Sequence, residues 1–270
     1  MKGIKNLTEG PILRQLFMLA MPIMATSFIQ MAYSLTDMAW VGRLGSEAVA
    51  SIGSVGLLTW MTSSIALLNK VGSEVSVGQS IGLRDETSAR SYATHNVTLS
   101  LVLSLIWASV LFVFATPIIG MYELEPHIAG NAVNYLRIVS SAFPFVFMSA
   151  TFTGIFNASG RSKIPFTINS IGLVINMLLD PLLIFVCDWK TEGAALATWI
   201  AQACVFGLFV YQLKARKILW ENFRFFGKLK RAYTTKIVKI GLPVATLNAL
   251  FAFVNMFLGR TASTVGGHIG

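Results

Sequence analysis

Two aspartates, Asp37 and Asp180, stand inside apolar stretches that are long enough to cross a lipid bilayer as helices. An ionisable side chain at such a position costs roughly 2.5–3.5 kcal/mol or more and is therefore a candidate for function. Asn176 precedes Asp180 by four residues, so the two share one face of a helix. Thr198 adds a hydroxyl from the next apolar stretch. Oxygen ligands of this kind suit a small cation such as sodium, whereas the carboxylates alone could carry a proton, and the sequence leaves both open.

The composition favours a membrane protein over every soluble class. Of the 270 residues, 54% are hydrophobic and only 12% are charged, against about 25% in ordinary globular domains, and the mean hydropathy is +0.67. Such a chain cannot cover a water-facing surface, which excludes a soluble enzyme, a disordered tail and a disulfide-stapled domain. The class that remains is an all-α polytopic membrane protein.

Enzyme chemistry has no support in the sequence. Cys187 and Cys204 lack metal-ligand spacing, the three histidines form no ligand pair, and no nucleophile motif or phosphate-binding loop occurs. We therefore expect neither an enzyme nor a cofactor. The one metal ion that the residues could hold is sodium, at the four oxygen-bearing side chains described above.

Hydropathy predicts seven membrane-spanning helices. They lie near residues 15–40, 47–69, 93–119, 129–153, 164–187 and 194–213, with a seventh from about 237 to 259. When alternate connections are assigned to opposite sides, sixteen Lys and Arg residues fall on the side of the N-terminus and three on the other. The positive-inside rule then places the N-terminus in the cytoplasm of a multi-pass protein of the cell membrane.

This orientation predicts where the candidate residues lie. The first and fifth spans both run from inside to outside, so Asp37 and Asp180 fall in the same outer layer of the membrane. Tyr135 and Arg137, near the outer end of the fourth span, reach that layer as well, and we expect them to line a substrate cavity there. Arg137 is either a counter-ion for one of the acids or a side chain that extends outward to the membrane surface, and the sequence does not choose between these.

An internal repeat predicts two lobes. The segment LAMPI at 19–23 and the segment IGLPV at 240–244 each open an apolar stretch that ends in Gly-Arg, and an Ile-Gly pair follows ten residues after that glycine in both copies. Parallel repeats of this sort are a transporter architecture, with the substrate site between the halves. We therefore expect a first six-helix lobe at 1–213, a basic cytoplasmic linker at 214–236, and at 237–270 the seventh helix and the start of a second lobe that continues beyond residue 270.

Nine basic residues lie between Lys214 and Lys239, interleaved with aromatic ones. Nucleic acid or a specific lipid head group would suit this pattern. We favour a cytoplasmic loop that lies on an anionic membrane surface, and so expect membrane lipid and no nucleic acid as partner.

Short motifs along the whole chain resemble one transporter family. They are SLTD at 34–37, GRLG at 42–45, QSIG at 79–82, GRSK at 160–163, the spacing from Asn176 to Asp180-Pro181, and GAALAT at 193–198. Together they resemble the multidrug and toxic compound extrusion (MATE) transporters. The resemblance implies twelve helices in two six-helix lobes, and antiport that exports amphipathic, often cationic compounds across a bacterial inner membrane against sodium or protons.

The same resemblance implies roles for particular residues. Asp37, Asn176, Asp180 and Thr198 match the family's first-lobe cation site, and Tyr135 matches a residue of the same cavity. Some members carry an acid in the seventh helix, where this chain has Phe251, so the first-lobe carboxylates are the better candidates. We expect the cation and the substrate to compete for one negative cavity.

Two alternatives remain open. A lipid-linked oligosaccharide flippase of the same superfamily would need a cavity rich in Arg and Lys for pyrophosphate, and only Arg137 qualifies in the predicted outer layer. A membrane scaffold or sensor that transports nothing would need no acids within the membrane.

Overall fold

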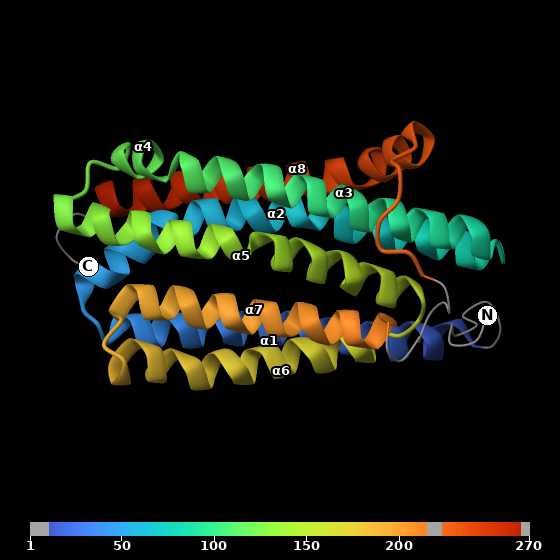
Figure 1. The fold of residues 1–270 in the computed structure, drawn as a ribbon, viewed down its shortest axis with the longest axis horizontal. Coiled ribbons are helices and arrows are strands. Elements are labelled where there is room, and N and C mark those ends of the chain that lie inside the picture. The colour runs from blue at the N-terminus through green and yellow to red at the C-terminus, as the bar shows by residue number, and fades with distance from the viewer. Residues whose placement is uncertain (1–10, 215–222, 266–270) are drawn as a thin grey trace.

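The computed structural model describes residues 11–214 and 223–265, and every regular element within them is helical (Figure 1). The helices run along one long axis and form two layers. One layer holds α2, α3, α5 and α8, the other holds α1, α6 and α7, and contacts between α5 and α7 join them. The elements are α1 (Ile12–Gly42), α2 (Ser46–Gly82), α3 (Glu86–Val113), α4 (Ala115–Gly120), α5 (Pro126–Ala158), α6 (Lys163–Pro181), the π-helical turn η1 (Leu182–Val186), α7 (Lys190–Lys214) and α8 (Arg231–Val265).

Six of these segments are long and apolar enough to span a membrane, with α6 and η1 together forming one of them. They confirm the predicted six-helix bundle, and α8 contains the predicted seventh helix. The second and third helices differ most from the predicted spans. The second runs to Gly82 rather than 69, and serines of this polar end satisfy their hydroxyls by bonding back to the helix, as Ser80 Oγ does to the Ser76 carbonyl at 2.9 Å. The third breaks after Val113, where Pro117 cannot donate to the carbonyl four residues earlier and its ring clashes there.

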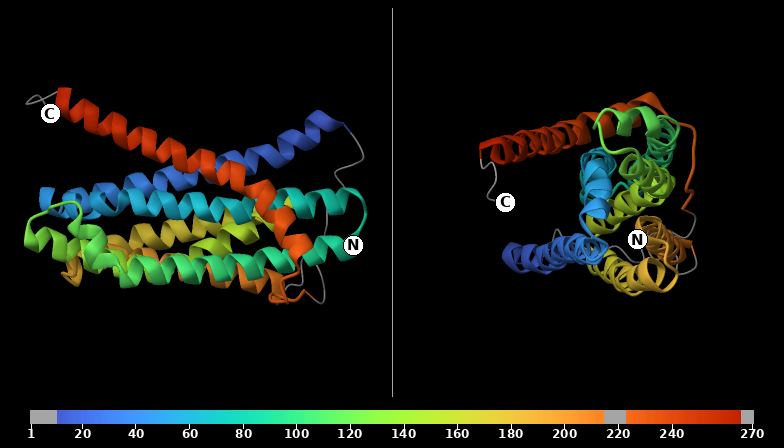
Figure 2. Two further views of the ribbon diagram at one scale, coloured as in Figure 1. Left: turned by 90° about the horizontal axis from the view of Figure 1, so that it is seen from above. Right: turned by 90° about the vertical axis from the view of Figure 1, so that its left-hand side faces the viewer.

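Glycines let α5 and α8 approach the backbone of α2 at one level. A Cβ on Gly154 of α5 would collide with the carbonyl oxygen of Lys70, and one on Gly241 of α8 would collide with that of Leu68. Because backbone atoms cannot yield as a flexible side chain can, both helices are fixed against this part of α2. Figure 2 shows α8 and α1 as outer helices that cross in the left-hand view and lie along opposite edges of the molecule in the right-hand view.

The described part of the linker folds back onto the bundle. Thr94 Oγ1 of α3 donates to the Arg224 carbonyl at 2.8 Å, and the Gly227 amide donates to Thr98 Oγ1 at 3.2 Å. The ring of Phe225 lies edge-on to that of Phe152, with centroids 5.9 Å apart. The linker is thus held against α3 and α5.

Candidate functional site

Asp180 lies one residue before the break in the α6 segment. Pro181 follows it, and the chain then enters the π-helical turn η1, where the Cys187 amide bonds to the Leu182 carbonyl at 2.9 Å. Such turns within helices are frequent at functional sites. Asn176, one turn earlier, donates from Nδ2 to Asp180 Oδ1 at 3.1 Å, and both side chains are fully buried.

Five oxygen-bearing side chains meet at this break, and we call them the carboxylate cluster. They are Tyr33, Asp37, Asn176, Asp180 and Thr198. Asp37 of α1 lies close enough to Asp180 to interact with it electrostatically, and Tyr33 lies close to Thr198 and to both aspartates. The structure therefore brings together all four residues that the sequence predicted. Tyr33 was missed, although it precedes Asp37 by one helical turn and so shares its face.

The oxygen atoms of the cluster have unused bonding capacity. Each of the five side chains has one buried oxygen with no hydrogen-bond partner among the described residues: Tyr33 Oη, Asp37 Oδ1, Asn176 Oδ1, Asp180 Oδ2 and Thr198 Oγ1. A buried polar atom without a partner costs about 1–3 kcal/mol of stability. Five such oxygen atoms in one place therefore indicate a binding site for a cation or a proton. Hard oxygen donors of this type fit a sodium ion, and two adjacent carboxylates equally fit a bound proton.

Tyr135 and Arg137 lie in different surroundings. Tyr135 of α5 is buried and adjoins the cluster, where it interacts electrostatically with both aspartates. Arg137 reaches α4, where its Nη2 lies 3.4 Å from Thr116 Oγ1, and it lines a separate depression of about 400 Å³. Within the described residues no ion pair joins Arg137 to either aspartate. Their predicted substrate roles stay predictions.

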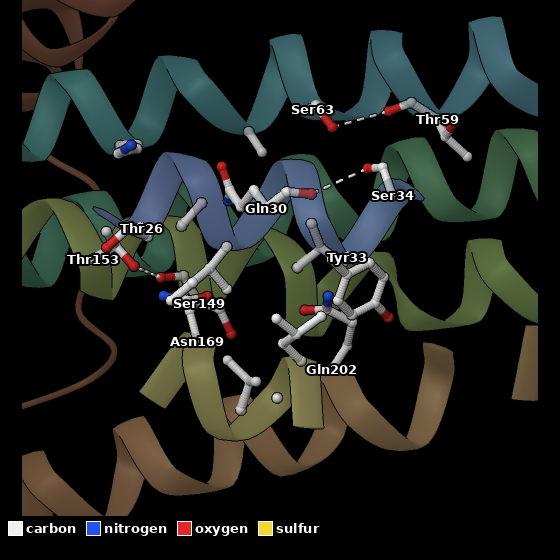
Figure 3. A pocket seen from close by; sticks show the side chains of 18 of the residues that line it. Thr26, Gln30, Tyr33, Ser34, Thr59, Ser63, Ser149, Thr153, Asn169 and Gln202 are labelled. Carbon is white, nitrogen blue, oxygen red and sulfur yellow. Dashed lines mark hydrogen bonds between the residues drawn. The ribbon is translucent and has the colours of Figure 1, made fainter. Parts of the chain in front are cut away.

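A larger cavity of about 730 Å³, which we call the central cavity, lies between α1, α2, α5, α6, α7 and α8. Figure 3 shows hydroxyl and amide side chains pointing into it from several helices, among them Gln30, Tyr33 and Gln202. On each of the three helices that build the cluster, the cavity residues lie on its side toward the predicted cytoplasm. They occupy 26–34 on α1, 169–173 on α6 and 201–205 on α7.

Neither aspartate lines the central cavity. Tyr33 lines the cavity and also interacts with both carboxylates, so competition between cation and substrate for one negative cavity stays a prediction. Tyr33 and Gln202 also adjoin each other, and Tyr33 belongs to both regions. Tyr33 therefore connects the acids with the cavity.

Similarity to known proteins identifies the family of this chain. The MatE family model matches residues 22–182, which is more than half of the chain. The chain belongs to the MATE family. The match covers the cluster residues of α1 and α6 together with most of the cavity-lining helices.

Individual relatives of this MATE chain are distant. It is 25% identical over 274 residues to the probable multidrug resistance protein NorM of Thermotoga maritima, covering 95% of this chain and 57% of that protein. It is 24% identical to a FAD transporter of Shewanella oneidensis, covering 94% and 56%. A solved structure of MATE in complex with MaD3S superposes with a TM-score of 0.91 at 23% identity, covering 99% of this chain and 60% of that one. The chain thus spans under two thirds of the length of these proteins, and the structural likeness confirms the fold.

Proposed function

We propose that this chain forms part of a cation-coupled antiporter that exports amphipathic small molecules across a bacterial inner membrane. The carboxylate cluster carries the proposal, because its unsatisfied buried oxygens lie next to a cavity large enough for a small organic molecule. Intramembrane acids are expensive to keep, and a scaffold that transports nothing would have no use for them.

In the proposed cycle a sodium ion or a proton enters the cluster from outside and satisfies its oxygens. Tyr33 belongs to both regions, so a change at the cluster repositions a wall of the central cavity. Pro22 lies within α1, where its missing N–H leaves a point at which the helix can bend. A cation that favours one arrangement of α1 weakens cargo binding, and the cargo leaves outward. The cycle needs no cofactor.

The names of relatives do not fix the cargo. They include a multidrug resistance protein and a FAD transporter, so both drugs and a phosphate-bearing molecule occur among them. A flippase for lipid-linked pyrophosphate has less support, because that group calls for several cationic side chains. Among the cavity-lining residues the structure describes, the positive charge is limited to one lysine.

Transport in sealed vesicles tests the proposal. The protein at its full native length is reconstituted and loaded in turn with rhodamine 123 and carboxyfluorescein, xanthene dyes of opposite charge. Efflux is followed under an imposed sodium gradient and then a proton gradient. We expect one gradient to drive efflux and Asp37→Asn to abolish it. Asp188→Asn is the matched control, since Asp188 is an exposed residue of the outer turn whose positive φ asparagine tolerates. Gradient-driven efflux that survives Asp37→Asn contradicts the proposal.

The proposed orientation has a test of its own. Cys187 is exposed at the end of η1, on the side assigned to the outside, whereas Cys204 is half-buried within α7. A membrane-impermeant maleimide applied to intact cells should label the protein, and Cys187→Ser should remove the label. Labelling of Cys187 only in inverted vesicles would reverse the orientation.

A further inference from the structure

The central cavity contains one charged side chain, Lys70 of α2, among the described residues that line it. It lies twelve residues before the end of α2 at Gly82, or about 18 Å along the helix axis. Lys70 thus lines the cavity away from the end of the helix. The remaining polar lining consists of hydroxyl and amide groups, which carry no charge, and of the phenol of Tyr33.

Lys70 has no counter-ion among the described residues. It is half-buried, and no ion pair or hydrogen bond joins its ammonium group to another residue within the described part of the chain. The acid nearest in sequence, Glu74, lies one turn further along α2 and accepts a hydrogen bond from Asn157 Nδ2 at 2.8 Å. Asp37 and Asp180 do not line the cavity. A lysine kept inside a membrane protein without a partner marks a site where a partner binds.

The backbone at Lys70 is held in place. Gly154 of α5 packs directly against the Lys70 carbonyl, and Gly241 of α8 packs against that of Leu68. The stem of Lys70 therefore starts from a fixed point in the cavity wall. Hydroxyls and amides line the same cavity, among them Ser63, which Figure 3 shows there. A positioned cation with neutral hydrogen-bond donors nearby is a binding site for an anionic group.

We propose that the central cavity selects amphipathic organic anions, and that Lys70 pairs with the carboxylate or phosphate group of the cargo. This inference rests on the proposed function in that the cavity is taken to hold the cargo. Apolar lining residues such as Trp60 and Leu173 suit the body of such a molecule. A cationic cargo would instead be repelled by this ammonium group, which no acid among the described cavity residues neutralises.

The charge of the cargo changes what drives its export. When an anion leaves as a cation enters, both movements carry positive charge inward, so an inside-negative membrane potential accelerates the exchange. Exchange of a monovalent cationic cargo for one cation moves no net charge. The proposed cargo class therefore predicts efflux of carboxyfluorescein that speeds up when valinomycin and potassium impose such a potential.

Binding to the purified protein at its full native length tests the role of Lys70. Carboxyfluorescein and rhodamine 123 share a xanthene core and differ in charge, and their affinities are measured by fluorescence anisotropy. We expect Lys70→Gln to weaken carboxyfluorescein by at least about tenfold, the value of a charge-assisted hydrogen bond, and to leave or strengthen rhodamine 123. Lys70→Arg should stay within about threefold because it retains the charge. Lys163→Gln, at the exposed start of α6, is the matched control and should change nothing.

Ser63→Asp gives the same test without removing the lysine. Ser63 is exposed to the cavity two turns before Lys70, so a carboxylate there adds a negative charge to the same wall and should weaken carboxyfluorescein and strengthen rhodamine 123. The inference is overturned if the unaltered protein prefers rhodamine 123, or if Lys70→Gln weakens both dyes equally. Since binding needs no gradient, a charge preference that persists without gradient-driven efflux refutes the proposed antiport and keeps this assignment.

Discussion

The carboxylate cluster and the central cavity are neighbours with opposite chemistry. The cluster is closed and acidic, with five buried oxygens that have no partner among the described residues. The cavity is open and holds a lysine among neutral hydroxyls and amides. On α1, α6 and α7 the two regions follow each other along the same helices, so the difference between them is one of depth. A cation and an anion can therefore each have a site suited to its charge.

This separation bears on how coupling could work. If cation and cargo competed for one set of carboxylates, the two would exclude each other directly. In this geometry the proposed cation site and the cavity share Tyr33, which offers the most direct route for coupling, through that side chain and α1. Coupling of this kind is a difference in cargo affinity between two arrangements of α1, typically a factor of 5 to 150.

The largest expected effect comes from neutralising the cluster. Asp180→Asn keeps the shape of the side chain and can still accept from Asn176, but it removes one of the two charges. Because Asp180 does not line the cavity, dye affinity should change by less than about threefold while gradient-driven efflux is lost. Parallel anisotropy and vesicle assays check this. An equal fall in dye affinity and in efflux would show that cargo contacts the cluster.

A smaller effect is expected at the shared tyrosine. Tyr33→Phe removes only the hydroxyl, so the dye should still bind, but the ratio of its affinities with and without the coupling cation should approach one. Tyr135→Phe is the contrasting variant, since Tyr135 adjoins the same aspartates without lining the cavity. It should weaken cation binding and preserve the ratio at saturating cation. If both variants abolish the ratio, communication is not specific to Tyr33.

The depth of the candidate residues along the membrane normal could be predicted from the sequence. The side of the bundle on which each one lies could not. Counting residues from the span ends placed Asp37, Asn176, Asp180 and Thr198 in one layer, and the structure brings them together. The same count grouped Arg137 with them, although it faces α4 on another side of the bundle. Which face of a helix meets which neighbour depends on packing, and hydropathy carries little information about it.

Lys70 is a residue whose position in the cavity hydropathy did not predict. Lys70 follows the end of a predicted span at 47–69, so the sequence gives no reason to place it deep in the protein. It does lie deep, because α2 continues for twelve residues through a segment whose serines and glycines lower the hydropathy. Serine hydroxyls that bond to a carbonyl of their own helix leave no unpaired polar group, so they are tolerated within a membrane. A hydropathy count scores them as polar all the same.

A packing change at the level of Lys70 should affect the cavity and spare the cluster. A Cβ in Gly154→Ala would meet the Lys70 carbonyl, so α5 must move away from α2. We expect destabilisation of about 1–3 kcal/mol, seen as a lower Tm in detergent, and weaker dye binding. Cation binding should change little. Gly207→Ala on α7, where the added atom meets open space, is the control. An unchanged Tm would contradict the close packing.

The smallest expected effect lies in the linker, furthest from the cluster. Phe225 packs against Phe152, next to the cavity residue Thr153, and Lys214 Nζ lies 5.2 Å from the Phe225 ring centroid. Such a cation–π contact is worth about 0.5–1 kcal/mol at an exposed site. Phe225→Ala should therefore release the linker and speed trypsin cleavage several-fold, while efflux falls by less than about twofold. Phe226→Ala should do neither, because the Phe226 side chain is 56% exposed. A loss of efflux as large as that in Asp180→Asn would mean that the linker takes part in coupling, and that cluster and cavity alone do not account for it.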